Sequence, residues 1–113
     1  MEESILNSVK KLLGIVPEYE AFDTDLITHI NSVFMILQQM GVGPEEGFTI
    51  SDSSATWDDF TTDTKLVGVR TYVPLKVRLI FDPPTGSTKE AVENVVAEME
   101  WRLYSEVEYH KNE

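Results

Sequence analysis

The sequence predicts an all-α fold, a compact four-helix bundle that occupies residues 1–113 as a single domain. Three observations lead to this prediction. Apolar residues recur with helical spacing in four segments, and glycine or proline residues end three of them. The chain also contains just one long run of alternating apolar residues, so no second long strand is present to pair with it. Between the second and third helices, residues 41–63 are expected to form a long loop or a small β-hairpin.

The first helix is expected over roughly residues 3–13. Its apolar stripe consists of Ile5, Leu6, Val9, Leu12 and Leu13. Gly14 offers a C-terminal cap, and Pro17 prevents the helix from continuing.

The second helix is expected over roughly residues 24–40 and has the clearest pattern. Asp23 or Thr24 suits its N-terminal cap, and Gly41 can take the left-handed conformation at its end. One face carries Leu26, Ile27, Ile30, Val33, Phe34, Leu37 and Met40. Met35 lies on the opposite, polar face, where it is a candidate contact for a partner.

Residues 41–63 contain more aromatic side chains than a simple linker needs. The segments FTI and ATW, separated by SDSS, indicate a short hairpin. An isolated two-stranded hairpin is marginally stable in water, so its apolar residues must be anchored. The anchors are Phe48, Ile50, Trp57 and Phe60, and they pack either on the chain's own helices or on a neighbouring subunit.

Residues 64–81 fit two patterns. Valine and leucine alternate as in a strand, but a strand of this length is unusual and has no partner. On a helical wheel, Leu66, Val69, Val73, Val77 and Ile80 form a tight arc. We therefore expect a central helix that is kinked near Pro74.

The fourth helix is expected from Ser87 to about Tyr109. Asp82, Pro83 and Pro84 stop the preceding helix, and Ser87 with Glu90 matches a capping box. One apolar face carries Val92, Val95, Val96, Met99, Leu103 and Val107, and a second carries Ala97, Trp101 and Tyr104. A helix with two apolar faces either packs between two neighbours or offers one face to a partner.

The composition excludes several classes of protein. The formal net charge of −11 argues against free, non-specific DNA binding. Residues 63–81 are the only positively charged segment, and their four cations, Lys65, Arg70, Lys76 and Arg78, are expected to pair with the protein's own carboxylates. The chain has no cysteine, no apolar run long enough to span a membrane and an acidic start unlike a signal peptide, so we expect synthesis inside the cell.

Candidate catalytic and metal sites are weak. Asp25 and His29 lie one helical turn apart but have no nucleophile beside them, which favours a boundary histidine. The second histidine, His110, lies in a polar tail. Oxygen-bearing side chains in the loop resemble a calcium site but lack its glycine and final glutamate; they are Asp52, Ser54, Thr56, Asp58 and Asp63. We expect no cofactor, no metal and no enzymatic activity, although an enzyme that uses His29 stays an alternative.

The order of segments resembles a known family. LITHINSVFMILQQMG is followed by GVGPEEGF, SATWDDF and TYVPLKVRLIFDPP, which lie between Leu26 and Pro84. The order of elements around them matches over Ile5 to Leu103. This arrangement resembles the head–tail connector, or adaptor, proteins of long-tailed bacteriophages and prophages. The resemblance implies a helix over residues 64–81, although a mid-helix Pro74 departs from the pattern.

The resemblance also implies a function. It implies a structural virion protein that assembles as a homo-oligomeric ring beneath the portal protein, binds the next tail-proximal connector protein and continues the DNA channel without specific DNA binding. The expected location is the head–tail junction of the virion, after synthesis in the host cytoplasm. The candidate interface residues are Met35, Phe48, Trp57, Phe60, Trp101 and Tyr104. The alternative is a small acidic helical interaction or regulatory module with no virion role.

Overall fold

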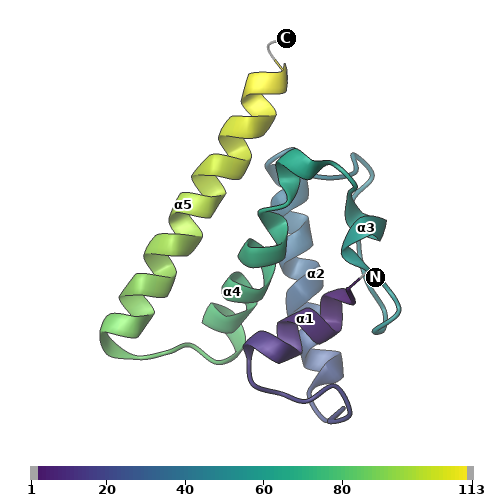
Figure 1. The fold of residues 1–113 in the computed structure, drawn as a ribbon, viewed down its shortest axis with the longest axis vertical. Coiled ribbons are helices and arrows are strands. Elements are labelled where there is room, and N and C mark those ends of the chain that lie inside the picture. Colours follow the sequence, from purple (N-terminus) through teal and green to yellow (C-terminus); the bar gives the residue numbers. More distant parts are fainter. Residues whose placement is uncertain (1–2, 112–113) are drawn as a thin grey trace.

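The structure contains helices and no strand over residues 3–111, which confirms the all-α prediction. The computed structural model describes these residues, except for the side chains of His110 and Lys111. Its elements are α1 (Ile5–Leu12), α2 (Asp23–Gln39), α3 (Trp57–Phe60), the 3₁₀ helix η1 (Thr64–Leu66), α4 (Val69–Phe81) and α5 (Gly86–Lys111) (Figure 1). The four longest helices correspond to the four predicted segments.

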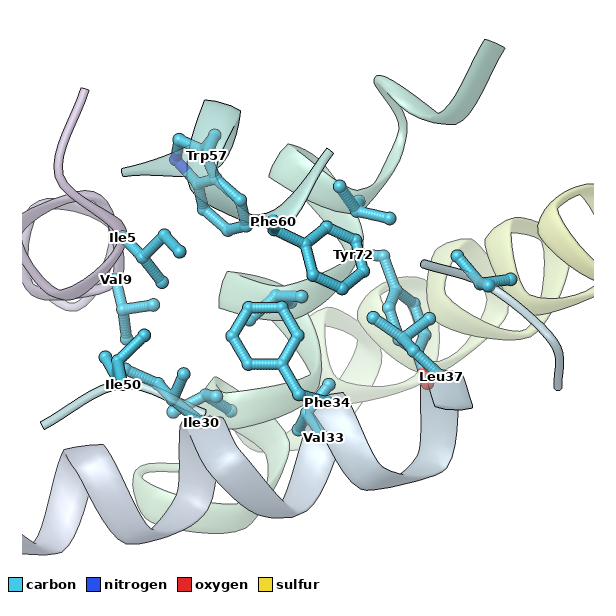
Figure 2. Packing of buried hydrophobic residues seen from close by; sticks show 14 of the residues in the cluster. Ile5, Val9, Ile30, Val33, Phe34, Leu37, Ile50, Trp57, Phe60 and Tyr72 are labelled. Atoms are coloured by element: carbon cyan, nitrogen blue, oxygen red, sulfur yellow. The ribbon is translucent and has the colours of Figure 1, made fainter. Parts of the chain in front are cut away.

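Helix α4 occupies the centre of the structure. It packs against α1, α2 and α5, and α5 lies along the side of α4 that faces away from α1 and α3 (Figure 1). The apolar core lies between α1, α2 and α4 and is closed by the loop that carries α3 (Figure 2). The inward residues of α4 are fully or almost fully buried; they are Val69, Tyr72, Val73 and Val77. The near-continuous apolar pattern of residues 64–81 reflects this central position.

The predicted glycine caps end the first two helices. Gly14 and Gly41 both have positive φ angles. After α2, the Val42 N–H donates to the Leu37 carbonyl at 2.8 Å, and the Gly41 N–H donates to the Gln38 carbonyl at 2.9 Å. These two bonds form a Schellman motif, which satisfies carbonyls that the helix end leaves without partners.

The predicted cap at the start of α2 is wrong. Phe22 occupies the cap position and makes no side-chain hydrogen bond there. Asp23 lies in the first turn, and its carboxylate instead accepts a bond from the Lys10 ammonium at 2.8 Å. Lys10 is 1% exposed and also donates to the Pro17 carbonyl at 2.9 Å. A buried ion pair therefore fixes α1 and the α1–α2 loop to the start of α2.

Of the two forms expected for residues 41–63, the structure shows the long loop, and the hairpin is wrong. The Ala55 carbonyl accepts from the Ile5 N–H at 3.0 Å, and the Trp57 N–H donates to the Glu3 carbonyl at 3.3 Å. The ATW segment thus pairs with the start of the chain. The FTI segment is held elsewhere, because the Asn31 side chain both accepts from the Ile50 N–H and donates to its carbonyl.

The third predicted helix is interrupted on the N-terminal side of Pro74. Residues 64–81 divide into η1 and α4, which are separated by Val67 and Gly68. Pro74 is buried inside α4, and the helix continues through it. Because proline has no N–H, the helix lacks one bond there, but packing against α1 and α2 maintains it.

Helix α5 begins one residue earlier than expected, at Gly86. The Lys89 N–H donates to the Thr85 carbonyl, so Ser87 lies within the first turn and the predicted capping box is wrong. Val96 and Leu103 are buried against the body. Among the residues that the structure describes, the Trp101 side chain of α5 is the most exposed large apolar group.

Candidate subunit interface

Two of the six predicted interface residues lie in the core of the monomer. Trp57 is 2% exposed, and its indole N–H donates to the Ser8 hydroxyl at 3.1 Å. The Phe60 ring lies 4.9 Å from Phe34 and 5.4 Å from Phe48, measured between ring centroids. Figure 2 shows Trp57 and Phe60 pointing toward Phe34 on α2. The prediction that their side chains form a surface contact is therefore wrong, because they anchor the long loop to its own helices.

A second pair lies together at the surface beside α2. Met35 is 52% exposed, and Phe48 is half-buried with its ring edge against Phe34. Both residues line a shallow pocket of about 310 Å³. The other lining residues are polar or small, and the single charged one is Glu46. This Met35–Phe48 patch is a small apolar area with an acidic edge.

The third pair occupies the outer face of α5, defined here as Ala97, Trp101 and Tyr104. Trp101 is 68% exposed and Tyr104 is 49% exposed. They lie one turn apart, with Trp101 on the side of α5 away from the buried residues Val96 and Leu103 and Tyr104 on its flank. Helix α4 packs against both α2 and α5 (Figure 1), so the outer face of α5 and the Met35–Phe48 patch beside α2 belong to helices on either flank of α4.

Charged residues surround the outer face of α5. The acidic side chains along and beside it are Glu90, Glu93, Glu98 and Glu108. Arg102 forms an ion pair with Glu98 at 2.8 Å, four residues away on the helix. The outer face therefore combines two large aromatic rings with a negative surrounding.

A polar network joins α5 to α4. The Tyr72 hydroxyl donates to the Glu100 carboxylate at 2.7 Å, and the Lys76 ammonium lies 3.2 Å from the same carboxylate. Burial raises the pKa of Tyr72 well above its usual value, and the hydrogen bond and negative charge of Glu100 raise it further. The Arg70 guanidinium lies 3.2 Å from Asp58. The expected pairing with the protein's own carboxylates is thus confirmed for Arg70 and Lys76.

A groove between α1 and α4 was not predicted from the sequence. It has a volume of about 490 Å³, and Trp57, Pro74, Leu12 and Leu75 supply its apolar lining. Its other lining residues are Glu3, Ser8, Lys11, Arg70 and Thr71. The sequence feature that could have indicated this groove is the positive charge of residues 63–81, a segment that also contains Leu75. The structure shows that Leu75 is half-buried. This α1–α4 groove opens on a different surface from the outer face of α5.

The residues considered for catalysis do not form a reactive pair. Asp25 is exposed, and the His29 ring lies 6.2 Å from the Phe81 ring. Phe81 also contacts Phe22, which contacts the exposed Tyr19. His29 therefore borders an aromatic cluster at one end of the subunit. His110 was also considered, but its side chain lies outside the described part of the structure.

The acidic loop residues serve local structure. Asp52 accepts bonds from the Ser54 N–H and hydroxyl, and these bonds lower the pKa of Asp52. Asp59 completes a capping box with Thr56, and Asp63 caps η1. Across the described residues, no three or more acidic or histidine side chains gather as a metal site. Within the same part of the chain, every helix is too short or too polar to cross a membrane.

Comparison with known proteins gives one assignment. No curated protein and no solved structure matches the chain significantly. The sequence model of a family described as "Phage connector protein" matches residues 5–110, which is almost the whole chain. The match includes every helix described above, with only the last residue of α5 beyond it. The chain therefore belongs to the phage connector protein family.

Proposed function

We propose that this chain is a structural subunit of a phage head–tail junction that acts as a single domain and not as an enzyme. The family match over residues 5–110 carries the proposal. The subunits form a ring beneath the portal protein, bind the next tail-proximal connector protein and continue the DNA channel. They are made in the host cytoplasm and end up in the virion.

The distribution of exposed apolar residues supports assembly by head-to-tail contacts. Such a ring needs two different patches on each subunit, one for each neighbour. The outer face of α5 supplies one of them, because its aromatic rings are largely exposed in the monomer. The Met35–Phe48 patch lies elsewhere and is available to a further virion protein.

The net charge suits a DNA channel. A subunit with a formal charge of −11 repels phosphate groups, and a ring multiplies this effect. DNA can then slide through the ring without binding to it. Accordingly, the purified ring is expected not to retain duplex DNA at physiological salt, and tight retention would contradict this role.

Electron microscopy of the protein mixed with its portal protein tests the proposal. The expected result is a ring of added density on the tail-facing side of the portal. A control uses the portal alone, and a second control uses the protein alone, since ring closure can depend on the portal as a template. A protein that never associates with the portal, and whose gene lies outside the block between capsid and tail genes, would instead be an interaction module with no virion role.

A further inference from the structure

The α1–α4 groove has the dimensions and lining of a binding site for a helix face. Its volume of about 490 Å³ is sufficient for a large aromatic ring. Leu12 is exposed on its α1 side, and Pro74 and Leu75 form its α4 side. The indole of Trp57 contributes to its lining from below. Amphipathic helices commonly bind in apolar grooves of this kind.

The edges of the groove carry exposed basic side chains. Lys11 is exposed on α1, and Arg70 is exposed on α4. Arg78 follows two turns after Arg70 on the same side of α4 and is half-buried. Two carboxylates are also present, because Glu3 lines the groove and Asp58 pairs with Arg70. The three cations still outnumber the two carboxylates here, on a chain whose formal net charge is −11.

The outer face of α5 has the complementary properties. Trp101 and Tyr104 project from it, and the small side chain of Ala97 leaves room for close approach. The carboxylates of Glu90 and Glu93 lie at the N-terminal end of the same face and are exposed. Aromatic anchors with a charged surrounding are typical of the centre and rim of a protein interface.

We propose that the α1–α4 groove receives the outer face of α5 from a second copy of this chain, with Trp101 as the central anchor. This inference rests on the proposed ring function and names the two surfaces that build it. Within one subunit, α5 is held on another side of α4 by the Tyr72–Glu100 bond. The contact is therefore made between copies, and it repeats head to tail around the ring.

Two other apolar patches fit this occupant less well. The Met35–Phe48 pocket is smaller, at about 310 Å³, and its charged lining residue is Glu46. The aromatic cluster of Tyr19, Phe22 and Phe81 has the acidic residues Glu18, Glu20, Asp25 and Asp82 nearby in the chain. Either patch would place carboxylates against the carboxylates of α5, and like charges across an interface oppose binding.

Cross-linking tests the contact cleanly, because the natural chain contains no cysteine. Two full-length single-cysteine variants, Leu12→Cys in the groove and Ala97→Cys on α5, are mixed and treated with a short bismaleimide. The expected product is a covalent dimer of the two variants. The matched control replaces Leu12→Cys with Met35→Cys, which places an exposed thiol on α2, outside the groove.

Selective cross-linking of positions 12 and 97 supports the proposal. Equal yields from positions 35 and 97, or no cross-link at any protein concentration or in the presence of portal, overturn it. If rings form on the portal but positions 12 and 97 are not cross-linked, the groove is not the binding site for α5, although the proposed connector function stands. Absence of both the rings and the product rejects the two proposals together.

Two further variants sharpen the test. Trp101→Ala is expected to weaken association roughly 30-fold or more, as the loss of a central aromatic anchor does. Lys11→Glu in the chain with Leu12→Cys is expected to lower the yield of the 12–97 cross-link, and so is Glu93→Lys in the chain with Ala97→Cys. When both charge changes are present in the mixture, the yield is expected to return. Failure of the pair to restore the yield would contradict the proposed pairing of charges.

Discussion

The two tryptophans of this protein lie in opposite environments. Trp57, at the start of α3, is 2% exposed and hydrogen-bonded to Ser8 on α1. Trp101, in the middle of α5, is 68% exposed and lies on the side of its helix that faces away from α4. Both residues belong to helices, so helical position alone does not decide their environment.

The difference follows from how many neighbours each region has. The loop that carries Trp57 packs against α1 and α2, because Trp57 is bonded to Ser8 on α1 and its ring contacts Phe34 on α2. Helix α5 packs mainly on α4 and η1 and is open on its other side (Figure 1). The long loop therefore buries its large aromatic residues in the core, whereas α5 leaves Trp101 and Tyr104 exposed.

The largest expected effect on the monomer comes from Trp57→Ala. It removes a large buried side chain and leaves a cavity, so we expect the free energy of unfolding to fall by about 3–5 kcal/mol. Urea unfolding followed by circular dichroism measures this change. A loss below about 1 kcal/mol would mean that the long loop is not anchored as described.

Asp23→Ala tests the buried ion pair that joins α1 to α2. The substitution leaves the Lys10 ammonium buried without its carboxylate, and we expect a loss of about 3 kcal/mol. Lys10→Met is expected to cost less, about 1 kcal/mol, because Asp23 is 26% exposed and water can solvate it. Unfolding curves of the two variants reveal the asymmetry, with exposed Asp25→Ala as the control.

Tyr72→Phe tests the hydrogen bond that joins α4 to α5 through Glu100. It removes one hydrogen bond to a charged group, and we expect a loss of about 1–2 kcal/mol near pH 7. Because the folded protein raises the pKa of Tyr72, an unfolded chain releases that proton first as the pH rises. The stability that Tyr72 contributes is thus fully present below its ordinary pKa of 10.0 and decreases above it.

Unfolding is measured from about pH 8 to about pH 11. Lysines and the other tyrosines also titrate in this range, and the comparison of wild type with Tyr72→Phe removes their contribution. Wild-type stability is expected to fall more steeply than that of Tyr72→Phe, so the difference between the two proteins narrows with pH. Parallel pH profiles would show that Tyr72 does not couple proton binding to folding.

Trp101→Ala is expected to have the smallest effect on the monomer. The free energy of unfolding should stay within about 0.5 kcal/mol of wild type, because the side chain is mostly exposed. Assembly, measured by electron microscopy with the portal protein, should be weakened much more. The reverse order, a destabilised monomer with normal assembly, would place Trp101 in the core and remove the contrast between the two tryptophans.

Much of the fold could be predicted because its signals are local. Gly41 ends α2 through its own backbone conformation, and Pro83 and Pro84 stop α4 whatever surrounds them. The candidate interface could be predicted only in part. Trp101, Tyr104 and Met35 are exposed as a helical wheel implies, but Trp57 and Phe60 are not at the surface.

The sequence by itself determined that the chain is all-α, where its four main helices lie and which phage family it resembles. These properties depend on residues a few positions apart, whose periodicity and backbone preferences are visible in the chain. The tertiary structure alone decided that ATW pairs with the start of the chain, that Lys10 is buried beside Asp23 and that α1 and α4 enclose a groove. Each of these features joins segments that are distant in sequence, and only packing of the whole core brings their atoms together.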